Sequence, residues 1–177
     1  MAQEKGDALV AEETFDFLVM IIVDYFLHSK EISNKASLKE DLVTKRKLER
    51  LESLGRDIGR RWLEKLAQDT PHLSTELDKV KFICKEFWTA TFQKQIDNLK
   101  TNNKGTYVLS DKIFKRLVHV SETPDSVGQI EDYMVFPLGM IKGALESLGM
   151  NCDVSGDCSN APSCVFTINV KEEQKEK

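Results

Sequence analysis

The stretch FDFLVMIIVDYFL, residues 15–27, carries apolar side chains on almost every side when it is wound into an α-helix. Its only polar interruptions are Asp16 and Asp24, which share a narrow strip of the helix surface. A helix that is apolar all round has to be covered by protein on more than one side. A domain of this size seldom buries a terminal helix completely with its own chain, so the stretch predicts contact with a second subunit.

Two other interpretations of residues 15–27 stay open. The β-branched side chains also permit a buried strand, and an ordinary core helix has the same apolar pattern. A membrane span needs about 20 apolar residues in a row, whereas the longest uninterrupted run, residues 17–23, has only seven. A signal peptide is disfavoured because residues 2–13 are acidic and no small-residue cleavage site follows them.

The composition predicts one domain. With 177 residues and 41% hydrophobic content, the chain is long enough for a substantial core. We place the domain at residues 12–171, between a flexible N-terminus at 1–11 and a disordered charged tail at 172–177. The net charge of −4 argues against nucleic acid as a partner, because phosphate binding needs a basic surface. Four cysteines, with no signal segment and no Asn-x-Ser/Thr site, predict a reducing cytosolic setting and free thiols.

An amphipathic helix is predicted at residues 45–66, after a polar segment at 29–44 that has the composition of a flexible linker. Gly55 and Gly59 lie four apart on its apolar side, and each costs roughly 1 kcal/mol relative to alanine. A close approach of another backbone would explain that cost, although simple tolerance of the glycines is also open. The apolar side spans about half of the helical wheel and consists of Leu48, Leu51, Leu54, Ile58, Trp62, Leu63 and Leu66.

Two more helices are predicted further along the chain. One begins after Thr75, which is followed three residues later by Asp78, as in a capping arrangement. The other, at 131–148, carries Gly139 and Gly143 as a second seam of small residues.

Short strands with turn residues between them are predicted in the rest of the chain, at 95–101, 106–109, 113–120, 151–157 and 164–171. The resulting element order is ααα-βββ-α-ββ. This order indicates an α+β fold in which helices pack on one side of a small antiparallel sheet.

The sequence contains no pattern typical of a catalytic or metal centre. The phosphate-binding, nucleophile-elbow and zinc-protease motifs are absent, and the three histidines lie far apart. Cys152, Cys158 and Cys164 are spaced by six, but structural zinc usually takes four ligands with close pairs among them. We therefore expect small buried thiols, no catalytic residues, no metal and no cofactor.

Several blocks of the sequence resemble a known family. LESLGRDIGRRWLEKLAQDTPHL (51–73) and ELDKVKFICKEFWTATFQKQIDNLKTNNKGTYVLSD (76–111) are similar to small subunits of the TRAPP (transport protein particle) complex, of the subunit-six type within the Bet-three-like family. LGMIKGALESLGM (138–150) and APSCVF (161–166) agree in the same order. The resemblance extends over roughly residues 12–171.

The resemblance implies a Bet-three-like fold whose first two helices form a dimer interface with a Bet-three-type subunit. It implies a structural subunit without enzymatic activity, next to other small TRAPP subunits. The assembled complex would be the guanine nucleotide exchange factor for a Rab/Ypt GTPase and a vesicle tether in ER-to-Golgi and intra-Golgi transport. The chain would be cytoplasmic and would reach the cis-Golgi and endoplasmic reticulum membranes only peripherally, through the complex. The interface residues expected on this basis are Leu18, Ile22, Tyr25, Leu51, Leu54, Gly55, Ile58, Gly59 and Trp62.

One departure from the family pattern concerns lipid attachment. Bet-three-type subunits carry an acylated cysteine in the loop after the second helix, where it feeds an apolar channel. The corresponding loop here, residues 68–74, has no cysteine, so we expect no lipid attachment and place Cys84 in the core. The alternative function is a small hydrophobic-ligand-binding domain, with an apolar cavity under Gly139 and Gly143.

Overall fold

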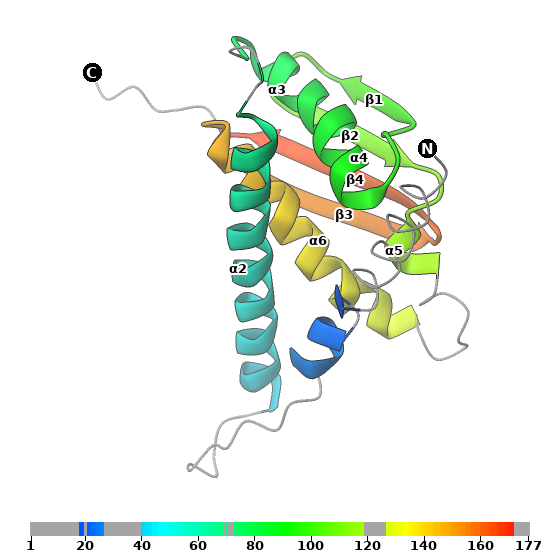
Figure 1. Cartoon of the computed structure of the whole chain (residues 1–177). Helices are drawn as coiled ribbons and strands as arrows, with labels where there is room; N and C mark the ends of the chain where they lie inside the picture. The colour runs from blue at the N-terminus through cyan, green and yellow to red at the C-terminus, as the bar shows by residue number, and fades with distance from the viewer. Residues whose placement is uncertain are drawn as a thin grey trace, which may run out of the picture. The chain divides into compact units, whose positions relative to one another are not determined.

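The computed structural model describes residues 18–19, 21–26, 40–68, 70, 73–118 and 127–171. The chain divides into two compact units, Met1–Leu51 and Glu52–Lys177, and each is considered by itself. The elements, labelled in Figure 1, are α2 (Glu40–Leu66), α3 (Glu76–Phe82), the π-helical turn η1 (Ile83–Phe87), α4 (Trp88–Phe92), β1 (Asn98–Thr101), β2 (Thr106–Asp111), α5 (Lys115–Val118), α6 (Val127–Ser147), β3 (Cys152–Asn160) and β4 (Ser163–Val170).

The first unit contains the predicted N-terminal helix. Residues 18–19 and 21–26 are helical, so this stretch is a helix and not a strand. The first unit also contains the start of α2, which begins at Glu40, five residues earlier than predicted. The end of the predicted linker at 29–44 is therefore helical, while its residues 29–39 lie outside the described part, as do the segments 1–11 and 172–177.

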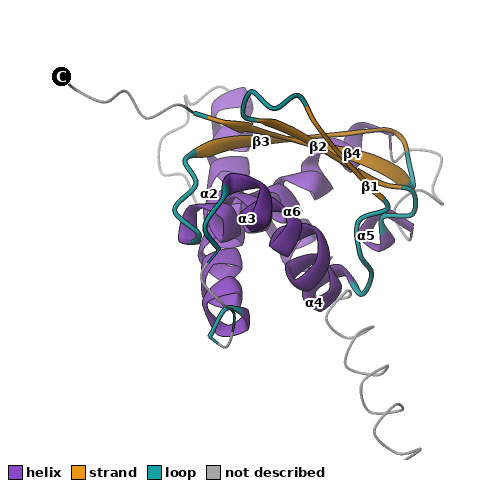
Figure 2. Ribbon diagram, turned by 90° about the horizontal axis from the view of Figure 1, so that it is seen from above, coloured by secondary structure: helices purple, strands orange, loops and turns teal. Residues whose placement is uncertain are grey.

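The second unit is built on a four-stranded antiparallel sheet with the order β1-β2-β4-β3. In the central pair, Leu109 of β2 lies opposite Phe166 of β4, and both side chains are fully buried. Figure 2 shows the helices of this unit gathered beneath one face of the sheet. The predicted α+β class, with helices on one side of an antiparallel sheet, is confirmed.

The strand predicted at 113–120 is wrong. The chain leaves the sheet after Asp111, whose side chain accepts a hydrogen bond from the Ile113 backbone N–H at 3.0 Å, and then forms the short helix α5. Phe114 and Leu117 lie three residues apart and are both buried, which is the spacing of one helical face. The described sheet accordingly has four strands where five were predicted.

The segment α3–η1–α4 follows the predicted third helix. The side chain of Thr75 caps its start by accepting the Asp78 backbone N–H at 3.1 Å, as the sequence predicted. Gln93 ends it in the left-handed conformation, with φ of 60°. Trp88 is fully buried, and its ring packs at 4.6 Å from Phe92 and 5.0 Å from Phe166, measured between ring centroids. The aromatic residues are thus core residues.

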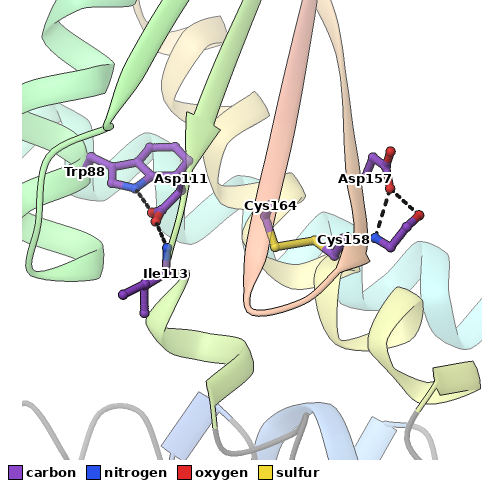
Figure 3. Close-up of a disulfide and its surroundings, with 7 residues drawn as sticks. Trp88, Asp111, Ile113, Asp157, Cys158 and Cys164 are labelled. Atoms are coloured by element: carbon purple, nitrogen blue, oxygen red, sulfur yellow. Dashed lines mark hydrogen bonds between the residues drawn. A yellow bond between two sulfur atoms is a disulfide. The ribbon is translucent and has the colours of Figure 1, made fainter.

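The cysteines do not all remain free thiols. Cys158 and Cys164 form a disulfide across the β3–β4 hairpin (Figure 3), whereas Cys84 and Cys152 are free and buried. The expectation of four free thiols is therefore wrong for this pair. The physical reason is that β3 runs on to Asn160, three residues past its predicted end, so the turn is short and the two cysteines face each other.

Candidate partner interface

The two pairs of glycines meet in one helix–helix contact within the second unit. A methyl group added at Gly59 of α2 would lie 2.7 Å from the Cα atom of Met140, and one added at Gly143 of α6 would lie 2.7 Å from the Cα atom of Arg56. Carbon atoms normally approach to about 3.5–4.0 Å, so only glycine fits at either position. Gly55 is in the same seam, where an added methyl group would lie 2.5 Å from the Phe136 carbonyl oxygen.

This seam confirms that another backbone approaches the glycines of α2, but the backbone is α6 of the same chain. Gly55 and Gly59 were expected at a partner interface, and the structure gives them a role inside the fold instead. The same packing bears on the cavity expected under Gly139 and Gly143. The backbone of α2 at Glu52 and Arg56 occupies that space, so it has no room for a ligand.

Ion pairs flank the seam. Two nitrogens of the Arg56 guanidinium donate hydrogen bonds to the carboxylate of Glu146 on α6, the shortest at 2.7 Å. The hydrogen bond to Glu146 is the main reason why the pKa of Arg56 is raised. Lys142 and Glu52 form a second pair at 3.3 Å. These pairs are partly exposed, so they orient the two helices more than they stabilise them.

The next face of α2 carries an open row of apolar side chains, which we call the α2 stripe: Leu54, Ile58 and Trp62. Residues four apart lie on one side of a helix. Leu54 and Ile58 each directly precede a glycine, so the stripe lies about 100° around the helix from the glycines. Trp62 is 39% exposed, while Leu54 and Ile58 are half-buried. The ammonium nitrogen of Lys65 lies 5.7 Å from the centroid of the Trp62 ring. Leu51, also expected at the interface, is fully buried and does not belong to the stripe.

A second open apolar surface lies on the N-terminal helix of the first unit, and we call it the first-helix face: Leu18, Ile21 and Tyr25. These side chains are 49%, 65% and 68% exposed, and the spacing i, i+3, i+7 puts them on one side. Ile22, which the sequence analysis chose in place of Ile21, is half-buried. Val19 and Val23 are buried. This helix therefore has apolar side chains that are covered on one side and open on another.

Two exposed apolar residues on the first helix and α2 were missed by the sequence analysis. Ile21 has helical spacing with Leu18 and Tyr25, so a stricter use of the helical wheel would have found it. Leu42 on α2 is 46% exposed, but it lies in the segment that was predicted to be a linker.

A buried carboxylate of the second unit, that of Asp111, has polar partners and serves the fold. Asp111 is fully buried; its carboxylate accepts a hydrogen bond from the Trp88 indole N–H at 3.0 Å and pairs with the Lys94 ammonium at 2.6 Å. Lys94 also pairs with Asp97 at 2.8 Å, and this hydrogen bond is the first cause of the lowered pKa of Asp97. Every oxygen of Asp111 has a partner, which leaves no free base there.

Metal and membrane sites were also sought in the described residues. No group of three or more His, Cys, Asp or Glu side chains in that part of the chain is placed to hold a metal ion. None of the helices described combines the length and the apolar character that a bilayer span needs. The first-helix face and the α2 stripe, each taken within its own unit, are two candidate partner surfaces.

Comparisons with known proteins agree on one family. The family model described as "Transport protein particle (TRAPP) component" matches residues 15–171. Trafficking protein particle complex subunit 6B of Mus musculus is 36% identical over 148 residues, which cover 82% of this chain and 94% of that protein. Subunit 6b of Danio rerio is 38% identical, with coverage of 83% and 94%. In fold, the chain resembles subunit 3 of Naegleria fowleri, solved with covalently bound palmitic acid, with a TM-score of 0.62, 17% identity and coverage of 91% and 97%.

Proposed function

The chain belongs to the transport protein particle (TRAPP) component family, and on that premise we propose that it is a structural, non-enzymatic subunit that pairs with a Bet-three-type subunit. The assembled complex, with further small subunits, would exchange the guanine nucleotide of a Rab/Ypt GTPase and tether vesicles in ER-to-Golgi and intra-Golgi transport. The chain would act on the cytoplasmic side, at the cis-Golgi and endoplasmic reticulum, without inserting into the membrane itself. The names of its relatives, which are all complex subunits where a role is given, support the structural role.

The single observation that carries the pairing is that each of the two N-terminal helices exposes large apolar side chains. Ile21 and Tyr25 of the first helix and Trp62 of α2 are large and are each at least 39% exposed. Burying a side chain of this size gains roughly 1.5–3 kcal/mol relative to leaving it in water. Exposed apolar residues that share one helix face are typical of protein–protein interfaces.

The stripe and the face also have the composition of binding hot spots. Tyrosine and tryptophan are enriched among the residues that dominate binding energy, because each contributes a large rigid surface with a polar end. Tyr25 and Trp62 have this character, and Lys65 extends over the Trp62 ring. We therefore assign the interface to the first-helix face and the α2 stripe, and we include Ile22 next to the first-helix face. Leu51, Gly55 and Gly59, which were also expected there, are left out because they pack inside the fold.

The experiment is co-expression of this chain with a Bet-three-type subunit, followed by native mass spectrometry of the purified protein. We expect a 1:1 heterodimer for the wild type and its loss in Leu18→Glu and Trp62→Glu, because each change places an unpaired carboxylate in the contact. Ile113→Glu is the matched control, since Ile113 is a 57% exposed apolar residue outside both helices. If Leu18→Glu and Trp62→Glu pair as strongly as Ile113→Glu does, the assigned surface is wrong.

A further inference from the structure

We propose that Cys158 and Cys164 form a reversible thiol–disulfide site, which a disulfide of the glutathione class closes and the corresponding thiol opens. This inference concerns the hairpin β3–β4 and does not depend on the proposed function.

The hairpin holds the two cysteines at disulfide distance. Asp157 pairs with Val165 and Asn160 pairs with Ser163, with a register shift between these two pairs, so both cysteines lie in this irregular part of the ladder. Their Cα atoms are 4.5 Å apart, within the range of about 4.4–6.8 Å that disulfides span. Figure 3 shows the bond running from β4 directly to the end of β3. The hairpin therefore places the two cysteines where the bond can form.

The two sulfurs differ in access. Cys164 is on the central strand β4 and is fully buried, whereas Cys158 is only half-buried on the edge strand β3. A dissolved thiol or disulfide reaches the sulfur that has an exposed path. Cys158 is therefore the sulfur that exchanges with the solvent, and Cys164 is the resolving sulfur behind it.

The other two cysteines are unsuited to this chemistry. Cys84 and Cys152 are both buried. Burial raises the pKa of Cys84 to about 12 and that of Cys152 to about 11. Because the thiolate is the species that reacts, both side chains stay unreactive near neutral pH. Among the four cysteines, exchange is thus confined to the hairpin pair.

The bond joins the two sides of the turn between β3 and β4. The turn between the two cysteines contains Pro162, whose carbonyl oxygen accepts the backbone N–H of Phe114 at 2.8 Å. Phe114 begins the approach to α5, and its ring packs 5.2 Å from Phe166, measured between ring centroids. Closing the disulfide fixes this turn, and opening it leaves the turn held by its hydrogen bonds alone.

The closing step balances as an exchange. The Cys158 thiolate attacks one sulfur of oxidised glutathione, forms a mixed disulfide and releases one glutathione thiolate. Cys164 then loses its proton and attacks the Cys158 sulfur, which forms the internal bond and releases the second glutathione thiolate. The two protein thiols are oxidised, one glutathione disulfide is reduced to two thiols, and the two protons end on the released thiolates. Reduced glutathione in excess drives the same steps backwards.

The test is exposure of the folded full-length chain to buffers with different ratios of reduced to oxidised glutathione, followed by acid quenching and peptide mass spectrometry. We expect the wild type to pass from four thiols to a single disulfide, between Cys158 and Cys164, and to return when reduced glutathione is restored. Cys164→Ala should trap glutathione on Cys158, because the resolving sulfur is missing. Cys158→Ala should leave Cys164 unmodified, because that sulfur is buried.

A second measurement covers the case in which a variant does not fold. Hydrogen exchange of the wild type, reduced and oxidised, should show protection of the Phe114 amide falling by about tenfold or more on reduction. A wild type that keeps four thiols in every buffer would overturn the proposal, and so would glutathione found on Cys84 or Cys152 of the folded protein. Equal protection of Phe114 in both states would refute the effect on the turn.

Discussion

Replacing Gly59 with alanine tests the seam between α2 and α6. The added methyl group would lie 2.7 Å from the Cα atom of Met140, about 1 Å inside normal carbon–carbon contact. Alanine favours a helix by about 1 kcal/mol over glycine, whereas overpacking a tight contact costs about 1–3 kcal/mol, and the obstacle here is backbone that cannot rotate away. Because the obstacle is backbone, we take the cost as about 2–3 kcal/mol, and after the gain of about 1 kcal/mol we expect a net loss of about 1–2 kcal/mol in the free energy of unfolding.

The assay is urea unfolding followed by far-UV circular dichroism, with Ser53→Ala as the matched control. Ser53 is exposed on the same helix, so its change to alanine should leave stability unchanged or slightly raised. Gly143→Ala should lower the free energy of unfolding by a similar amount. The double variant should lose less stability than the two single variants added together, because the first methyl group already separates the helices. A Gly59→Ala protein at least as stable as the wild type would refute the close approach.

Three further changes test the second unit. Asp111→Ala should lower stability by about 3–5 kcal/mol, because it leaves the Lys94 ammonium and the Trp88 indole N–H without their buried partner; chemical denaturation measures this, and a loss below 1 kcal/mol would contradict it. Cys158→Ser should lower stability by about 2 kcal/mol under oxidising conditions, from loop closure over a separation of six residues, and by far less with a reductant present. Asp97→Asn should weaken the dependence of the free energy of unfolding on pH in the acid range, which urea unfolding at a series of pH values measures. The pKa of Asp97 in the folded state lies below 3.8, so the stabilisation by its carboxylate is present above that pH and is lost as the pH falls through the lowered pKa.

The fold class could be predicted from the sequence because it depends on hydrophobic patterns that extend over whole helices and strands. Glycines four apart in two helices predicted a backbone contact, and the contact exists between Gly59 and Met140. What the pattern lacks is the identity of the approaching backbone, since a partner's helix and a helix of the same chain require the same glycines. Gly55 and Gly59 were therefore assigned to a partner contact, although α6 of the same chain covers their side of α2.

The sequence prediction was wrong where a short stretch is compatible with both a helix and a strand. IFKRLVHV, residues 113–120, has the β-branched content of a strand, but Phe114 and Leu117 are also at helical spacing, and tertiary burial of both side chains selects the helix. The disulfide was missed for a related reason. A shift of three residues in the end of β3 decides whether Cys158 lies in a loop or opposite Cys164, and strand ends are not encoded that sharply.

The width of the apolar side of α2 contained information that the periodicity alone did not. One neighbouring helix covers an apolar strip of about 100°, but the apolar residues of this helix spread over about half of the wheel. The glycine side is covered by α6, and the stripe next to it, which ends at Trp62, stays open. Two neighbouring faces of one helix thus have different roles, so Gly59→Ala should change stability while Trp62→Glu changes pairing. If Trp62→Glu destabilised the isolated chain as much as Gly59→Ala does, the stripe would belong to the core and the case for an interface on α2 would fail.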